Sequence, residues 1–161
     1  MNIGAWTSCQ ANYFTGERIR LLTIVDNYGK YSPAIEVRKS FKGTDAVRVL
    51  DQAVSKYGLP KIIKPDNGPE FISKELDLWA YSNKVGLDYS RLGKPTDNAY
   101  IESFNGRIRQ ECLNQNWFLS LANAQAKIDD RREDYNSNRP HREVGTKVPD
   151  RRGSKIRIKS Y

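Results

Sequence analysis

The chain is short of cysteine, histidine and long apolar runs. Its 161 residues include two cysteines, Cys9 and Cys112, and one histidine, His141. Two cysteines are too few for a disulfide framework, and they lack the spacing of a metal site. The longest aliphatic stretch, around Leu21 to Val25, is far below the length that crosses a bilayer. Because the N-terminus also lacks a signal-peptide pattern, we expect a protein of the reducing cytoplasm.

Positive charge is the main excess in the composition. The chain has 27 lysines and arginines against 19 acids, a formal net charge of +8. This balance indicates either a polyanionic partner or a basic, well-solvated surface. The tail at 147–161 is especially basic, and it reads equally well as a nucleic-acid arm or as a frayed terminus.

Apolar patterns predict an alternation of strands and helices. A hairpin is expected at 18–37 with its turn at 27–30, followed by a helix over 44–57 that Thr44 caps. Further strands are expected at 61–64 and 87–92, and further helices at 73–86, 97–112 and 120–135. This order predicts an α/β fold with a mixed sheet flanked by helices. Trp79 and Trp117 are expected as core anchors.

The segment KPDNGPEF places an acid where a buried strand ends. Asp-Asn-Gly is ordinary turn chemistry, and on composition alone Asp66 is a turn residue. However, functional crevices of open α/β sheets lie beyond the carboxyl ends of strands. Asp66 is therefore a candidate catalytic residue.

The helix expected over 97–112 carries two different faces. The core face follows steps of three and four, at Ile101, Phe104, Ile108 and Cys112. The other face sets one carboxylate among amides and guanidinium groups, at Asn98, Glu102, Asn105 and Arg109, with Arg107 nearby. Such a face favours phosphate contacts, although a solvated helix surface is the alternative. Lysines of neighbouring elements add charge, at Lys64, Lys84 and Lys94.

A strand-end carboxylate and a helical carboxylate can share divalent metal ions. Two-metal sites stabilise the attacking and leaving oxygens of a phosphodiester, and Mg²⁺ suits carboxylate and water ligands. Asp66 and Glu102 are the candidate ligands. Two such ions normally require a third carboxylate.

Both motifs resemble the catalytic core of bacterial insertion-sequence transposases of the OrfB type, which are related to retroviral integrases. Thirty-five residues separate Asp66 from Glu102, within PDNGPEF and GKPTDNAYIESFNGRIRQECLNQNWF. The resemblance covers about residues 16–149 and includes DYNSNRPHREVG. It implies a ribonuclease-H-like fold, an Asp-Asp-Glu triad binding Mg²⁺ or Mn²⁺, and strand cleavage and transfer on DNA. Asp66 and Glu102 match the second and third acids.

The resemblance also implies partners and DNA-contacting residues. The partners are transposon ends, target DNA and further copies of a transposase, in a bacterial cytoplasm. The residues expected to contact DNA are Lys64, Lys94, Asn98, Asn105, Arg107 and Arg109.

The first acid of the triad is missing. It belongs on a central first strand whose text in the family is similar to Trp-Ser-Met-Asp-Phe, but GAWTSCQAN holds no acid. Asp26 ends the following strand and is rated as structural. We therefore divide the chain into an aberrant segment at 1–15, a catalytic core at 16–146 and the tail at 147–161.

The genetic code suggests why the acid is missing. The codons of Trp6 and Thr7 force an Asp codon in an overlapping reading frame, and those of Met1 and Asn2 force a Glu codon. We hypothesise that residues 3–14 are an out-of-frame translation of the catalytic strand, in a truncated and catalytically impaired copy. The alternatives are a non-catalytic DNA-binding or regulatory fragment, and a nuclease that recruits Asp26.

Overall fold

The structure is a computed structural model that describes residues 2–9, 18–65, 68, 71–89, 99–138 and 155–157. For 2–9, 99 and 155–157 the description concerns the backbone. The strands are β1 (Asn2–Cys9), β2 (Ile19–Asp26), β3 (Tyr31–Arg38), β4 (Ile62–Lys64), β5 (Gly86–Leu87) and β6 (Lys155–Arg157). The helices are α1 (Gly43–Tyr57), α2 (Lys74–Ser82), α3 (Ala99–Ile108) and α4 (Leu121–Asn138), and a π-helical segment, Arg109–Leu113, extends α3.

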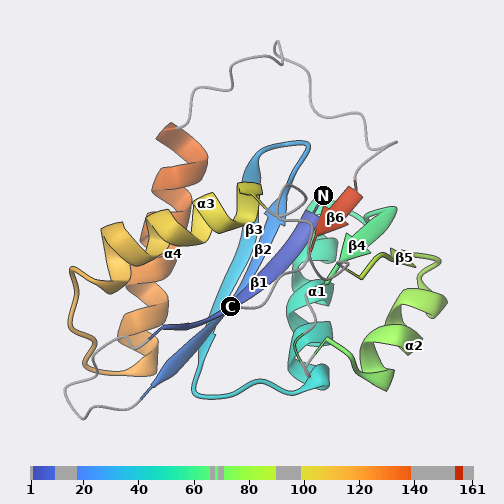
Figure 1. Ribbon diagram of the computed structural model, residues 1–161, viewed down its shortest axis with the longest axis horizontal. Helices are drawn as coiled ribbons and strands as arrows, with labels where there is room; N and C mark the ends of the chain where they lie inside the picture. The colour runs from blue at the N-terminus through green and yellow to red at the C-terminus, as the bar shows by residue number, and fades with distance from the viewer. Residues whose placement is uncertain are drawn as a thin grey trace.

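The strands form one mixed sheet between two pairs of helices (Figure 1). Strand β2 is its centre, because its residues alternate between two hydrophobic cores. Leu22 and Ile24 pack with α1 and α2, whereas Leu21 and Val25 pack with α3 and α4. This alternation is the period of two expected for a strand that is buried on both faces.

Helices α1 and α2 begin close to the positions predicted from the sequence. The apolar stripe of α1 is buried as predicted, but its N-cap is Lys42 rather than Thr44. Helix α2 begins after Ser73, whose hydroxyl accepts a hydrogen bond from the backbone N–H of Leu76. Trp79 is buried as expected, and its indole N–H donates to a carboxylate oxygen of Asp51 at 2.6 Å.

The expectation for Trp117 is wrong. Its side chain is 63% exposed, while the neighbouring Phe118 is fully buried in the core beneath α3 and α4. Of these two neighbouring aromatic residues, Phe118 points into the core and Trp117 points to the surface.

Strand β6 alters the strand order that the resemblance implies. β1 pairs antiparallel with β2, with Trp6 opposite Leu22 and Thr7 opposite Leu21. β6 lies between β2 and β4, antiparallel to the first and parallel to the second. In the described residues β1 therefore pairs with β2 alone and only contacts β4, whereas the resemblance implies a central first strand flanked by the second and fourth strands. Residues 155–157 of the basic tail are thus part of the sheet.

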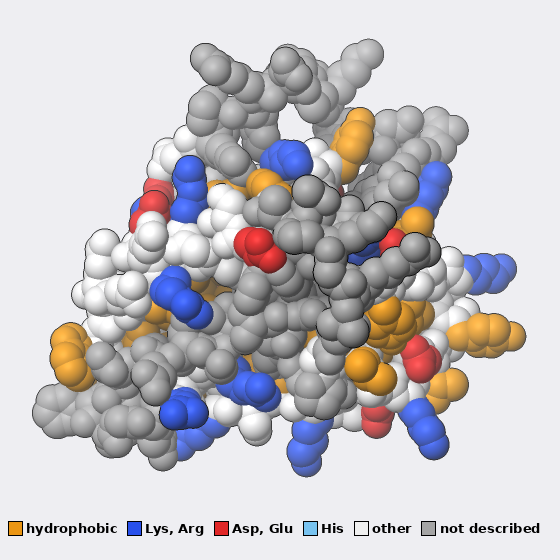
Figure 2. Space-filling view, viewed as in Figure 1, with side chains coloured by type: hydrophobic (Ala, Val, Ile, Leu, Met, Phe, Trp, Pro, Cys, Tyr) orange, Lys and Arg blue, Asp and Glu red, His pale blue; other side chains and the backbone are white. Residues whose placement is uncertain are grey.

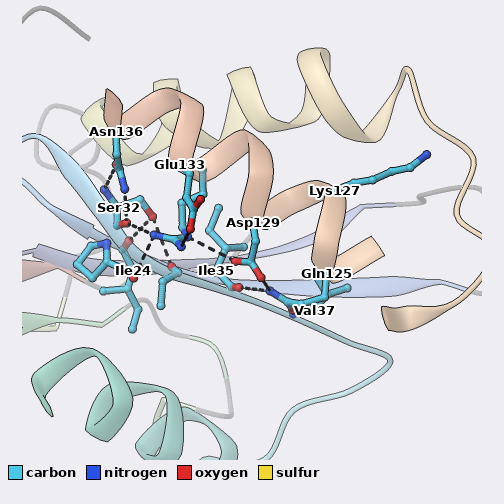
Figure 3. A network of polar contacts seen from close by, with 12 residues as sticks. Ile24, Ser32, Ile35, Val37, Gln125, Lys127, Asp129, Glu133 and Asn136 are labelled. Carbon is cyan, nitrogen blue, oxygen red and sulfur yellow. Dashed lines mark hydrogen bonds and ion pairs between the residues drawn. The ribbon is translucent and has the colours of Figure 1, made fainter. Parts of the chain in front are cut away.

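Helix α4 closes the outer edge of β3 with polar side chains (Figure 3). The amide group of Gln125 accepts from the backbone N–H of Val37 at 2.8 Å and donates to the carbonyl of Ile35 at 2.7 Å. Asn136 repeats the arrangement on Ser32, accepting from its N–H at 2.9 Å and donating to its carbonyl at 3.0 Å. Exposed strand edges invite pairing with other chains, and here α4 occupies that edge.

Replacing Gln125 by alanine should leave the Val37 N–H and the Ile35 carbonyl without protein partners. We expect Gln125→Ala to lower the free energy of unfolding by about 1–3 kcal/mol, measured by urea denaturation. Gln52→Ala, at an exposed position of α1, is the matched control and should change it by less than about 0.5 kcal/mol. Equal urea midpoints for the two variants would contradict this role of Gln125.

Candidate active site on helix α3

Helix α3 presents Glu102 at the boundary between core and surface. Ile101, Phe104 and Ile108 are each at most 3% exposed and fix the rotation of the helix against the sheet. Glu102 is consequently half-buried in the first turn of α3. The core face predicted for this helix is therefore confirmed at Ile101, Phe104 and Ile108. Of the predicted polar face, Glu102 and Asn105 lie on α3, and Arg109 begins the π-helical segment.

Asn105 lies one turn after Glu102 and has a buried amide nitrogen. This nitrogen makes no hydrogen bond to any residue that the structure describes. A buried donor without a partner is costly, and such groups often mark a site that a ligand or water completes. A phosphate oxygen or a metal-bound water is an acceptor of the required kind, so Asn105 fits a site for DNA and metal beside Glu102.

The predicted cations differ in how they are engaged. Lys64, at the end of β4, pairs with a carboxylate oxygen of Asp88 at 2.9 Å. Arg107 and Arg109 are both exposed, and within the described part of the chain Arg107 makes no hydrogen bond or ion pair. On the face drawn in Figure 2, the lysine and arginine side chains of the described residues are scattered rather than gathered in one continuous patch.

Three predicted site residues, Asp66, Lys94 and Asn98, lie outside the described residues. Asp66 follows directly after Pro65, which is buried at the end of β4. His141 also lies outside them. In the segments that the structure describes, no group of three His, Cys, Asp or Glu side chains is placed to hold a metal ion.

Asp26 serves the hairpin that joins β2 and β3. It is 6% exposed, and one carboxylate oxygen accepts a hydrogen bond from the backbone N–H of Tyr28 at 2.7 Å. Gly29 follows in the same turn, and a side chain there would collide with the ring of Tyr31. This geometry is that of an acid that stabilises a turn.

Arg132 is a buried cation that the sequence analysis missed. Its guanidinium donates to the carbonyls of Ser32 and Pro33 at 3.2 and 3.5 Å, and it is 9% exposed. The available signal was its spacing, because Arg132 continues the apolar positions of Ala124 and Ile128 at steps of four. An arginine on an apolar stripe indicates a charge that is buried with partners.

Comparison with known proteins decides the family. A model of the integrase core domain matches residues 6–95, and a second integrase core domain model matches residues 83–149. The chain belongs to the integrase core family. The first match includes positions 6 and 7 of β1.

Two relatives come from insertion elements. A protein of insertion element IS407 from Burkholderia multivorans is 46% identical over 142 residues, which are 88% of this chain and 51% of that protein. A protein of insertion element IS476 from Xanthomonas euvesicatoria is 45% identical over 132 residues, which are 82% of this chain and 38% of that protein. The chain thus spans about half or less of these relatives. The matches confirm the predicted resemblance to insertion-sequence transposases with an integrase-like core.

Solved integrases share the fold. The superposition with the catalytic core of BIV integrase covers 89% of each chain, with a TM-score of 0.60 and 11% sequence identity. The HTLV-2 integrase core, solved in complex with magnesium, has a TM-score of 0.55 and 22% identity over 80% of this chain and 83% of its own. The predicted ribonuclease-H-like fold is confirmed. No helix among the described residues is both long and apolar enough to span a bilayer.

The surroundings of Asp26 predict a pH dependence. Burial, together with the charge of Asp26 and the nearby Tyr57, raises the pKa of the Tyr31 hydroxyl above its ordinary value of 10.0. Because the folded pKa exceeds the unfolded one, Tyr31 contributes stability that is complete below about pH 10 and is lost as the pH rises further.

Tyr31→Phe removes this titration and should flatten the alkaline loss of stability. Between about pH 10 and pH 11 the native chain should lose up to about 1 kcal/mol more than the variant, in urea denaturation at each pH. Tyr81→Phe, whose parent side chain is 87% exposed, is the control and should behave as the native chain. Parallel pH profiles of the native chain and Tyr31→Phe would refute the assignment.

Proposed function

We propose that the chain is the core of an insertion-sequence transposase that binds DNA and whose strand-cleaving chemistry is impaired by the missing first acid. The observation that carries the proposal is the integrase core match together with Glu102 and the unpaired amide of Asn105 on one helix. Asp66 and Glu102 would hold Mg²⁺ or Mn²⁺. When bound, such ions activate the attacking oxygen and stabilise the leaving oxygen of a phosphodiester.

The protein's own groups would bind and orient the DNA. Glu102 is half-buried in the first turn of α3, and the Asn105 amide would supply a donor for a phosphate oxygen. Arg107 and Arg109 would contact the backbone on either side. Assembly with further transposase copies belongs to the same proposal, since one structural relative, from simian T-cell lymphotropic virus, was solved as an intasome.

The register of β1 supports position 7 as the place where an acid would complete the triad. Directly opposite residues of an antiparallel pair lie on the same face of a sheet. Position 7 lies opposite Leu21, which packs with α3 and α4, whereas position 6 lies opposite Leu22, which packs with α1 and α2. An acid at position 7 would therefore share a face with the helix that carries Glu102.

Thr7→Asp should restore metal binding and Mg²⁺-dependent nicking of transposon-end DNA. We expect Mn²⁺ affinity, followed by titration calorimetry, to rise about tenfold or more, because a third carboxylate joins the site. Thr7→Asn controls for shape without charge, and Trp6→Asp places the same charge on the other face. If Thr7→Asp bound Mn²⁺ no better than Thr7→Asn, the proposed place of the triad would be rejected.

The coding sequence tests the origin of the defect. The nucleotides for residues 1–15 and the region upstream should spell Trp-Ser-Met-Asp-Phe in an overlapping frame if the hypothesis is correct. An overlapping frame without that text would make the missing acid a property of the protein as it stands.

A non-catalytic role in DNA binding is the second candidate. It is favoured by the opening segment, in which GAWTSCQAN offers no acid. Salt-dependent DNA binding by the native chain without Mg²⁺-dependent nicking would support it. Mg²⁺-dependent nicking by the native chain would instead support the nuclease alternative, provided that Asp26→Asn abolished it.

Arg107→Ala tests the proposed DNA contact. The exposed guanidinium has no partner among the described residues, so its loss should weaken DNA binding about three- to tenfold and reduce the salt slope by about one. Lys74→Ala, at an exposed position of α2, removes the same charge elsewhere and serves as the control. Equal losses in the two variants, read by fluorescence anisotropy over a salt series, would show that only net charge matters.

A further inference from the structure

Two tyrosine hydroxyls join the first turn of α3 to the C-terminal part of α4. The hydroxyl oxygens of Tyr100 and Tyr135 lie 2.8 Å apart and share a hydrogen bond. The ring of Tyr135 also packs edge-on against Phe104 of α3, with centroids 4.6 Å apart. Two contacts of different chemistry thus hold the same two helices together.

Lys30 adds a third element to this cluster. Its ammonium nitrogen lies 4.5 Å from the centroid of the Tyr100 ring, within the range of a cation–π contact. Figure 1 shows the hairpin of β2 and β3 near the start of α3. The hairpin, α3 and α4 therefore meet at one tyrosine side chain.

The backbone of Lys30 ends the hairpin turn in the left-handed region, with φ at +55°. This turn conformation determines where the Lys30 side chain leaves the hairpin, and the contact that the side chain makes is with Tyr100.

We propose that Tyr100, held by Tyr135 and Lys30, is a positioning residue for Glu102. Tyr100 and Glu102 are two residues apart in the first turn of α3, so a shift of that turn moves the carboxylate. The buried Ile101 and Phe104 fix the rotation of the helix, whereas the hydroxyl pair and Lys30 fix the end of it. This inference rests on the proposed function, in which Glu102 binds the metal.

The precision that metal binding requires makes the tether consequential. A ligand carboxylate must be held to within about 0.5 Å, and helix ends fray unless side chains secure them. Tyr100 is not itself a ligand in this scheme. Tyr100 acts by holding the first turn of α3 in position, and this turn carries Glu102.

The experiment measures Mn²⁺ affinity of the full chain by titration calorimetry, with Thr7→Asp as the common background. Tyr100→Phe and Tyr135→Phe each remove one hydroxyl and keep the ring, and each should weaken Mn²⁺ binding about three- to tenfold. The double variant should lose less than the sum of the two single losses, because the two hydroxyls share one hydrogen bond. Tyr81→Phe removes an exposed hydroxyl on α2 and should change nothing.

Two further measurements separate the possible failures. Glu102→Gln should weaken Mn²⁺ binding most, and if it does not, the proposed metal site and this inference both fall. If Glu102→Gln weakens binding but Tyr100→Phe matches Tyr81→Phe, the inference alone is overturned. Thermal unfolding without metal should place Tyr100→Phe within a few degrees of its background. Additive losses in the double variant would also overturn the coupling.

Discussion

Side-chain amides of α4 take the place of a neighbouring strand along the outer edge of β3. Gln125 and Asn136 each return both a donor and an acceptor to the strand backbone. Backbone groups at a covered edge must find partners, so α4 can lie against the sheet only in this register. Helix α3 then packs against α4 and β1, and the position of Glu102 follows from that packing.

Arg132 makes this contact more demanding. Its buried guanidinium is held by the Ser32 and Pro33 carbonyls and by the carboxylates of Asp129 and Glu133, at 3.2–3.5 Å. A buried charge is costly when it loses its partners, so any displacement of α4 along β3 would expose that cost. The polar contacts of α4 therefore define where the helix lies, while Ala124 and Ile128 supply its apolar packing.

Local patterns predicted most of the elements, although the strand expected over 87–92 is described only as Gly86–Leu87. They did not predict the pairing of segments that lie far apart in the sequence. The central hairpin, the stripe of α1 and the two faces of α3 follow from periodicities that the sequence displays directly. By contrast, the pairing of Lys155–Arg157 with β4 joins segments about ninety residues apart, and a three-residue strand has no period of its own. The Tyr100–Tyr135 contact was missed for the same reason, since each tyrosine alone resembles an ordinary core aromatic.

In β1, pairing within the sheet depends on the backbone, whereas metal binding would depend on a side chain. β1 pairs with β2 through main-chain groups, which every residue except proline offers in full. A segment with unsuitable side chains can therefore keep its place in the sheet, and the shift in register between Ile3 and Trp6 is the kind of adjustment it would need. Metal binding has no such tolerance, because a carboxylate cannot be replaced by a backbone group of the same charge. A frameshift confined to this strand would thus preserve the architecture and remove the chemistry.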